Sequence, residues 1–494
     1  MMCWRDKFSG VLMWCGVAFL AGGLAGCAVG PDYERPELDI PGGYRDPGEV
    51  VVSGGREGGL GALPFAEVYP DTLLQGYIAD ALTNSWDVRI AVARVLQAEA
   101  AAQVARSWFW PTVQAGGDLQ TVRGSENMGT PIPAGVNPQR EYGTAALAMP
   151  AYEVDLWGRL RRADEAARAR LLAAEESRLT VQQTLVAQVA TVYFQLLALD
   201  RELAVSRATL TNSAVSLELA RTREEGGVAS MQDVYQAEAV VRRSEASIAV
   251  TMQAIEQAEN QLQILRGRNP GPVERAGSVT NDFRSARVPA GLPSELLERR
   301  PDVRLAEQQL VAANADVGQV KAMFYPQITL TGMAGFQSVS LGDLFTSGSR
   351  VWQFGPAVTV PVFTGGRLRG NLKQAEAAYE EALAVYQKAV QGAFRDVSDA
   401  LVAYQRTREF RERQQLLVDV NRSAMDLAMV RYEGGVTSYL EVTFNQQQLF
   451  DSELLLARAM RDELLSLVQL YRALGGGWTA DAVRAADRSE RGEG

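Results

Sequence analysis

The placement of proline limits the possible folds of this chain more than any other feature of the sequence. Of its 19 prolines, none lies between Pro150 and Pro270, and none follows Pro361. A proline inside a helix costs about 3 kcal/mol, because it lacks the backbone N–H and its ring clashes with the preceding turn. The two gaps are therefore the regions where very long helices can form.

The first gap has the pattern of such a helix. The segment Arg159 to Glu225 contains no glycine. Its apolar residues alternate at spacings of four and three, at Leu185, Val189, Val192, Leu196, Leu199 and Leu203. This 3.5-residue period is typical of helices that supercoil around neighbours. A second heptad run, from Val234 to Leu262, follows Gly226-Gly227, so the region predicts a hairpin of two long helices.

The second gap repeats this design. Residues 223–228 read Arg-Glu-Glu-Gly-Gly-Val, and residues 431–436, which lie 208 positions later, read Arg-Tyr-Glu-Gly-Gly-Val. The tetrapeptide Gly-Arg-Leu-Arg occurs at 158–161 and again at 366–369, with the same separation. The second heptad run also returns at this offset, so the sequence predicts an internal duplication.

Each repeat also contains two short segments of β type. They are Thr112 to Val122, Tyr142 to Pro150, Gln327 to Phe336 and Val351 to Phe363. Each is about as long as the 9–11 residues of a transmembrane β-strand. Four strands cannot close a barrel, and lipid does not accept an open sheet edge, so three chains would have to pool twelve strands. The alternative is a soluble four-stranded sheet that caps a helical body.

The N-terminus has the pattern of an export signal. Arg5 and Lys7 precede an apolar stretch that ends in Leu24-Ala-Gly-Cys27, which resembles a bacterial lipobox. We expect residues 1–26 to be a cleaved signal peptide and Cys27 to carry a covalent lipid. An aspartate after the cysteine would indicate retention in the inner membrane. Ala28 at this position instead favours a protein that is lipid-anchored in the outer membrane and extends into the periplasm. The alternative is an ordinary secretory signal with a chance cysteine.

The remaining boundaries follow from composition. Residues 27–70 are rich in proline and glycine and are expected to form an extended arm. We expect the first repeat at 71–270, a linker at 271–292, the second repeat at 293–478 and a charged, disordered tail at 479–494.

Composition excludes several classes of function. The chain has no histidine, which excludes catalytic triads and HExxH zinc sites. Its formal net charge of −10 argues against a nucleic-acid partner. No Walker loop, CxxC or GxSxG occurs. We therefore expect neither an enzyme nor a metal site, and no cofactor apart from the lipid on Cys27.

Several motifs together resemble one family. They are Cys27-Ala-Val-Gly-Pro-Asp-Tyr-Glu-Arg-Pro36, Asp155-Leu-Trp-Gly-Arg159, Glu298-Arg-Arg-Pro-Asp-Val-Arg304, Phe324-Tyr-Pro326, Pro361-Val-Phe-Thr-Gly-Gly-Arg367, Arg431-Tyr-Glu-Gly-Gly-Val436 and Leu474-Gly-Gly-Gly-Trp478. Their order and spacing are similar to those of the TolC-like outer-membrane efflux proteins, in the lipoprotein branch of OprM/NodT type.

The resemblance implies a mainly α-helical fold with membrane β-strands, in a homotrimer whose 12-stranded β-barrel continues into a 12-helix α-barrel. It implies the outer-membrane exit duct of a tripartite efflux system that passes drugs, toxic compounds or metal ions. The implied partners are a periplasmic membrane-fusion adaptor and an inner-membrane pump of RND type. Two alternatives remain open, namely a type I secretion exit duct and a non-channel periplasmic coiled-coil scaffold lipoprotein.

The candidate site residues lie at the two hairpin turns. Those that resemble adaptor-docking positions are Gly226, Gly227, Val228 and Ser230 in the first turn, and Gly434, Gly435, Val436 and Ser438 in the second. A purely structural interpretation is equally available, because glycine can end a helix in a left-handed conformation and serine can cap the next helix.

Two acidic residues follow these serines by three positions. Across three chains, Asp233 and Glu441 would supply six carboxylates near a narrow pore and favour cations. The alternative role is a capping box. The family often has a gating aspartate one turn after Glu441, where this chain has Phe444. We therefore hypothesise that Leu440 and Phe444 form an apolar constriction that gates by excluding water.

Overall fold

The computed structural model describes residues 28–38, 40–41, 44, 60–125, 139–275 and 293–477. The expected signal peptide, Cys27, most of the linker and the C-terminal tail lie outside these residues. The chain divides into two compact units. The strand unit comprises Met1–Pro36, Leu96–Ala173 and Glu307–Val385, and the hairpin unit comprises Glu37–Val95, Ala174–Ala306 and Tyr386–Gly494. Each unit therefore draws on both halves of the sequence.

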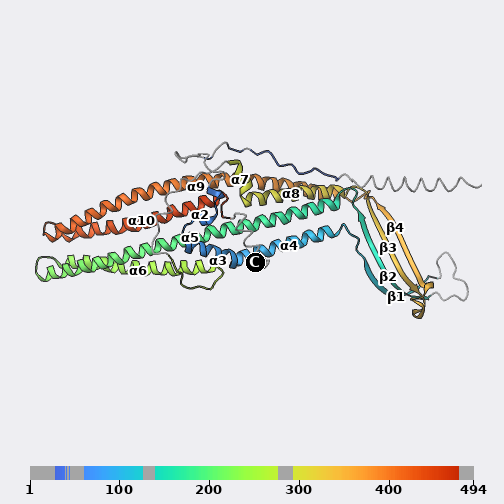
Figure 1. The fold of residues 1–494 in the computed structure, drawn as a ribbon, viewed down its shortest axis with the longest axis horizontal. Coiled ribbons are helices and arrows are strands. Elements are labelled where there is room, and N and C mark those ends of the chain that lie inside the picture. Colours follow the sequence, from blue (N-terminus) through green and yellow to red (C-terminus); the bar gives the residue numbers. More distant parts are fainter. Residues whose placement is uncertain are drawn as a thin grey trace, which may run out of the picture. The chain divides into compact units, whose positions relative to one another are not determined.

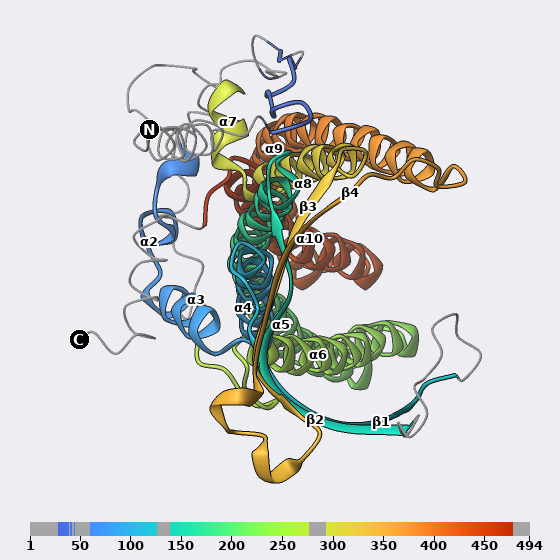
Figure 2. The ribbon, with the colours of Figure 1, turned by 90° about the vertical axis from the view of Figure 1, so that its right-hand side faces the viewer.

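The strand unit contains one antiparallel sheet of four strands. These are β1 (Gln114–Arg123), β2 (Gln139–Val154), β3 (Gln327–Ser338) and β4 (Arg350–Thr359), and they lie side by side in the order β1-β2-β3-β4 (Figure 1). The sheet is curved (Figure 2). Within the described chain β1 pairs with β2 and β4 pairs with β3, so β1 and β4 are the two edges of this sheet.

All four expected strands are present, but their bounds differ from the expectation. β2 continues past Pro150 because the register shifts between Met149 and Tyr152, and such an irregularity accommodates a residue that cannot donate to the ladder. β4 ends at Thr359, two residues before Pro361, rather than at Phe363. Among the described residues, no helix has both the length and the apolar character needed to cross a membrane.

Shorter helices precede each hairpin along the chain. They are α2 (Phe65–Val68), α3 (Thr72–Asn84), α4 (Trp86–Ser107), α7 (Pro293–Arg299) and α8 (Pro301–Ala322), with a 3₁₀ turn at Leu60–Ala62. The 3₁₀ turn and α2 correct the expectation of an extended arm up to residue 70. The Asp71 side chain accepts hydrogen bonds from the N–H groups of Leu73 and Leu74, so it caps α3.

Two hairpins of equal dimensions confirm the duplication. Hairpin 1 joins α5 (Arg159–Glu225, 67 residues) to α6 (Met231–Leu265, 35 residues). Hairpin 2 joins α9 (Arg367–Glu433, 67 residues) to α10 (Tyr439–Ala473, 35 residues), and Figure 1 shows both pairs. The heptad run on α6 has residues at intervals of seven from Val234 to Leu262, and all of them except Ile248 are buried.

Candidate functional site

The backbone of the two hairpin turns is the same. Val228 N–H donates to the Arg223 carbonyl at 2.9 Å, and Val436 N–H donates to the Arg431 carbonyl at 2.9 Å. These bonds close a Schellman motif at the end of each long helix. Gly227 and Gly435 occupy its left-handed position, with φ of 73° and 70°. Gly227 and Gly435 therefore end their helices in the left-handed conformation, which is the structural one of the two interpretations.

The first turn then starts α6 with a capping box. Asp233 N–H donates to Ser230 Oγ at 3.3 Å, and Ser230 N–H donates to Asp233 Oδ2 at 3.2 Å. This reciprocal arrangement satisfies two helix-terminal donors. The carboxylate of Asp233 thus accepts a hydrogen bond from the backbone N–H of Ser230.

The second turn differs, because Ser438 does not have the capping role that was one of its two interpretations. The Ser438 side chain makes no capping hydrogen bond. Glu441 instead accepts a hydrogen bond from the Thr437 hydroxyl and forms an ion pair with Arg431, with 2.9 Å between Nη1 and Oε1. Thr437 stands where the first turn has Ala229, so only the second turn offers Glu441 this hydroxyl. The positive charge of Arg431 offsets the negative charge of Glu441.

Behind the turns, a buried cluster joins the two hairpins. It contains Leu217 and Ala220 of α5, Val234, Ala237 and Val241 of α6, Ala428 and Tyr432 of α9, and Tyr439 and Val442 of α10. The rings of Tyr432 and Tyr439 meet edge to face, with centroids 5.2 Å apart. Burial raises the pKa of the Tyr439 hydroxyl to about 12.

Arg223 adds a polar link between the hairpins. Its Nη1 donates to the Tyr432 carbonyl at 2.8 Å, and its guanidinium lies 4.6 Å from the centroid of the Tyr432 ring. A cation over an aromatic ring is attracted by the ring's quadrupole. Arg223 of hairpin 1 therefore binds hairpin 2, whereas Arg431, its counterpart in the repeat, binds within its own hairpin.

The remaining candidate residues are exposed apolar side chains. Val228 and Val436 at the turns are 72% and 71% exposed. Leu440 and Phe444, four residues apart on one face of α10, are each 61% exposed. The repeat positions of Leu440 and Phe444 are Gln232 and Gln236 in hairpin 1, so this face is apolar in hairpin 2 alone.

Several sequence motifs contact segments that are distant in the sequence, and the motifs alone did not predict these contacts. In the strand unit, residues 28–36 lie along α5 and α8. Val29 N–H donates to the Trp157 carbonyl at 3.0 Å, and Asp32 pairs with Arg162 at 2.7 Å. Arg35 forms two hydrogen bonds of 2.7 Å with Glu307 of α8. The motif after Cys27 is therefore a strap that binds two helices.

A second junction orders the chain where β2 enters α5. The Asp155 carboxylate accepts hydrogen bonds from the N–H groups of Leu160 and Arg161, which places a negative charge at the start of α5. Trp157 Nε1 donates to the Pro326 carbonyl at 2.7 Å, and the Trp157 ring stacks on Tyr325 at 4.9 Å. Two motifs that are 169 residues apart thus contact each other.

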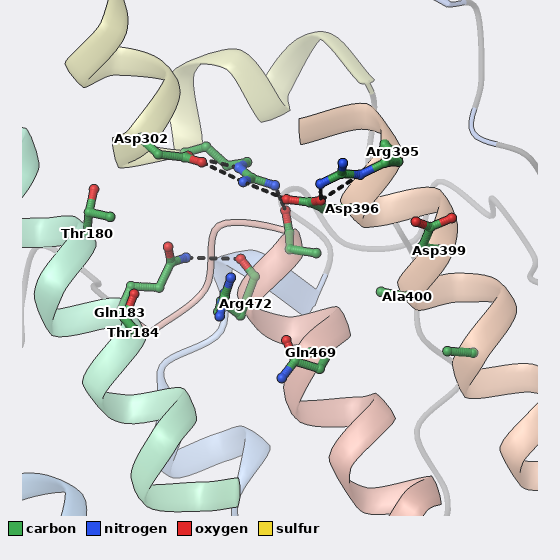
Figure 3. Close-up of a pocket in the computed structure, with 13 residues that line it drawn as sticks. Thr180, Gln183, Thr184, Asp302, Arg395, Asp396, Asp399, Ala400, Gln469 and Arg472 are labelled. Atoms are coloured by element: carbon green, nitrogen blue, oxygen red, sulfur yellow. Dashed lines mark hydrogen bonds and ion pairs between the residues drawn. The ribbon is translucent and has the colours of Figure 1, made fainter. Parts of the chain in front are cut away.

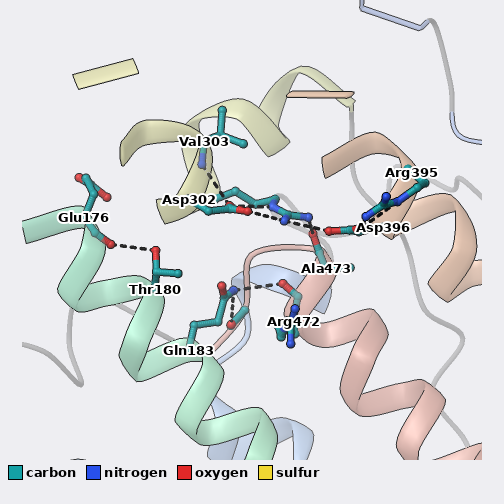
Figure 4. Close-up of polar contacts among 11 residues, drawn as sticks. Glu176, Thr180, Gln183, Asp302, Val303, Arg395, Asp396, Arg472 and Ala473 are labelled. Carbon is teal, nitrogen blue, oxygen red and sulfur yellow. Dashed lines mark hydrogen bonds and ion pairs between the residues drawn. The ribbon is translucent and has the colours of Figure 1, made fainter. Parts of the chain in front are cut away.

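A third junction forms around Arg300 in the hairpin unit. Figure 3 labels its two acidic partners, Asp302 and Asp396. Arg300 Nη2 lies 2.6 Å from Asp302 and 3.1 Å from Asp396, and its Nη1 donates to the Ala473 carbonyl (Figure 4). Burial lowers the pKa of Arg300, but its hydrogen bonds and ion pairs with the two aspartates outweigh burial and raise it. Nearby, Gln183 donates to the carbonyl of Gly476.

Arg300, Asp302 and Asp396 line a polar cavity of about 600 Å³ between α5, α8, α9 and the end of α10. Because these charges pair with one another, the cavity wall is a structural junction between helices. In the described part of the chain, no three acidic or cysteine side chains gather in a way that could hold a metal ion.

Comparison with known proteins gives consistent matches over nearly the whole chain. The family model described as "Outer membrane efflux protein" matches residues 77–268 and 292–476. The toluene efflux pump outer membrane protein TtgI of Pseudomonas putida is 36% identical over 457 residues, which cover 92% of this chain and 96% of TtgI. The outer membrane protein OprJ of Pseudomonas aeruginosa is 33% identical and covers 92% of this chain and 94% of its own.

Solved structures agree. The MtrE outer membrane channel of Neisseria gonorrhoeae, in its open state, superimposes with a TM-score of 0.80 at 30% identity, over 92% of this chain and 99% of MtrE. The CmeC outer membrane channel of Campylobacter jejuni has a TM-score of 0.83 at 21% identity, over 94% of this chain and 98% of CmeC, and supports the fold alone.

Paired long hairpins attached to a four-stranded sheet, with these relatives, define an outer-membrane channel protein of an efflux system. The chain belongs to the outer membrane efflux protein family. It is an exit duct in the outer membrane that extends into the periplasm, and it is a channel rather than an enzyme.

Proposed function

We propose that the protein works as a homotrimer that passes small apolar or amphipathic compounds from an inner-membrane pump and a periplasmic adaptor to the outside. The observation that carries the trimer is the sheet, whose edges β1 and β4 each pair with one strand in the chain. Lipid requires every backbone group to be paired, so β4 of one protomer pairs with β1 of the next, and three protomers close the barrel.

The substrate and partners are proposed from the relatives. TtgI is named as part of a toluene efflux pump, and the related ArpC as part of an antibiotic efflux pump. The pump is of RND type in this proposal, and the exposed Val228 and Val436 at the turns contact the adaptor. Cys27, outside the described residues, carries the lipid and directly precedes the strap in the sequence.

The periplasmic aperture is apolar in this proposal. The Asp233 carboxylate is held by the backbone N–H of Ser230 at the start of α6, and the charge of Glu441 is offset by Arg431. Leu440 and Phe444 are exposed on the adjacent face of α10. Three protomers bring three copies of this pair around the axis, and an apolar ring of this kind closes a pore by excluding water.

Single-channel recording in a planar bilayer tests the aperture. Truncating the ring should let water enter, so Phe444→Ala should raise the conductance or the open fraction several-fold over the wild type. Gln236→Ala, at the matching position of hairpin 1, is the control and should leave both unchanged. Equal conductance and open fraction for Phe444→Ala and the wild type would contradict the proposed aperture.

A further inference from the structure

A second cavity lies between the two hairpins, behind the turns. It has a volume of about 490 Å³ and is lined by α5 over residues 208–216, by α9 over residues 422–429 and by α10 over residues 446–453. Ligand pockets in proteins commonly have 300–1,000 Å³. The space is therefore large enough for an organic molecule of moderate size, with one wall from hairpin 1 and two from hairpin 2.

Part of the lining is apolar and adaptable. Met425 and Met429 of α9 are half-buried and pack against the buried cluster that joins the hairpins. Phe450 of α10 is 7% exposed. Methionine side chains adjust to irregular shapes and make favourable contacts with aromatic rings. This part of the wall suits an apolar or aromatic body.

One buried polar atom in the wall lacks a partner. Gln446 is 6% exposed, and its Nε2 donates to Ser213 Oγ at 2.7 Å. Its Oε1 is buried and accepts no hydrogen bond from any described residue. A buried acceptor without a donor is unfavourable, so a ligand that brings a donor gains a bond there. The repeat counterpart, Glu238, pairs with Arg242 instead.

Charges near the cavity favour a cation. Glu453 and Arg422 form an ion pair of 2.7 Å, and Asp426 is a second carboxylate in the lining. Two carboxylates against one guanidinium leave an excess of negative charge. An anionic occupant would be repelled by this excess.

From these contacts we infer that the cavity binds a small cationic amphiphile, with its apolar body on Met425, Met429 and Phe450 and an N–H of its ammonium group donating to Gln446 Oε1. Because the walls belong to both hairpins, the bound molecule bridges them. Binding to the folded state alone also raises the unfolding temperature.

Calorimetric titration of the full-length protein in detergent tests this inference, with 4-phenylbutylamine as the probe. Its trimethylammonium analogue has the same charge and body but no N–H. The wild type should bind the amine about tenfold more tightly than the analogue, and Gln446→Leu should abolish that preference. Weak binding of both probes by the wild type, or an amine preference that survives in Gln446→Leu, would overturn the inference.

A second pair of variants covers the case in which Gln446→Leu does not fold. Ala208→Phe introduces a ring into the cavity from an exposed position on α5, whereas Ala214→Phe places the same ring at an exposed position of α5 outside the lining. Ala208→Phe should weaken amine binding at least tenfold, and Ala214→Phe should leave it unchanged. Equal binding by the two variants would show that the amine binds elsewhere, for example to the micelle.

Discussion

The two hairpin turns have the same backbone but different side-chain contacts. Both close a Schellman motif around a left-handed glycine, at Gly227 and Gly435. In hairpin 1 the acidic residue Asp233 caps its own helix, and Arg223 reaches the other hairpin. In hairpin 2 the basic residue Arg431 pairs with Glu441 of the same hairpin.

This difference shows which part of a duplicated element can diverge. The turn geometry depends on glycine and backbone hydrogen bonds, so it is retained in both copies. The side chains determine what each turn contacts. Hairpin 2 contributes Tyr432 and Tyr439 to the buried cluster, where hairpin 1 has Glu224 and Met231, and it presents Leu440 and Phe444 outward.

The largest expected effect concerns the buried aromatic residues. Tyr439 is 1% exposed, whereas its counterpart Met231 is 51% exposed. Tyr439→Ala should lower the free energy of unfolding by about 3–5 kcal/mol, because it leaves a cavity between the hairpins. Met231→Ala should change it by less than about 0.5 kcal/mol. Urea titrations of the detergent-solubilised variants measure both, and equal losses would show that the two copies are packed alike.

The same residue gives a pH dependence. The hydroxyl pKa of Tyr439 rises from 10.0 to about 12 on folding because of burial. The folded state therefore holds this proton more tightly, and the corresponding stability is present below pH 10 and is lost between pH 10 and 12. This amounts to about 3 kcal/mol. Tyr439→Phe should reduce the alkaline loss of stability, while Tyr235→Phe, at a 63% exposed residue, should not.

The two arginines provide a sharper comparison. Arg223→Gln removes a hydrogen bond and a ring contact between hairpins and should cost about 1.5–3 kcal/mol. Arg431→Gln removes an exposed ion pair and should cost about 0.2–1 kcal/mol. The same urea titrations compare the variants. A larger loss for Arg431→Gln would mean that Arg223 does not join the hairpins.

The smallest effect should come from the caps. Ser230→Ala removes a capping box and should cost about 1 kcal/mol. Ser438→Ala should have an effect of less than about 0.5 kcal/mol, because its hydroxyl makes no capping bond. Thermal unfolding of both variants gives the comparison. Equal shifts of the midpoint would indicate that both serines cap their helices.

The long helices could be predicted because their signals are local. The absence of proline and glycine gave the bounds of α5 correctly, and the 208-residue offset recovered α9. The bounds of β2 were less accurate, because the irregularity beside Pro150 depends on pairing with β3, a strand from the other repeat.

The side-chain contacts were harder to predict, because their partners are distant in the sequence. Arg300 pairs with Asp396, 96 residues away, and Arg223 binds Tyr432, 209 residues away. No local pattern encodes such a pair. The motifs that carried the family resemblance did contain Arg300, Trp157 and Asp32, but their spacing did not reveal what they contact. Ser438 makes no capping bond, and the Glu441 side chain binds Thr437 and Arg431, a contact that the Ser-x-x-Glu pattern alone did not predict.

The measurement that tests the central proposal most directly is the mass of the detergent-extracted protein by light scattering, corrected for bound detergent. In this proposal three protomers pair the edges β1 and β4 with one another and close a 12-stranded barrel. We expect a single species with three times the mass of the mature chain. A stable monomer in mild detergent would contradict the pooled barrel and with it the proposed duct.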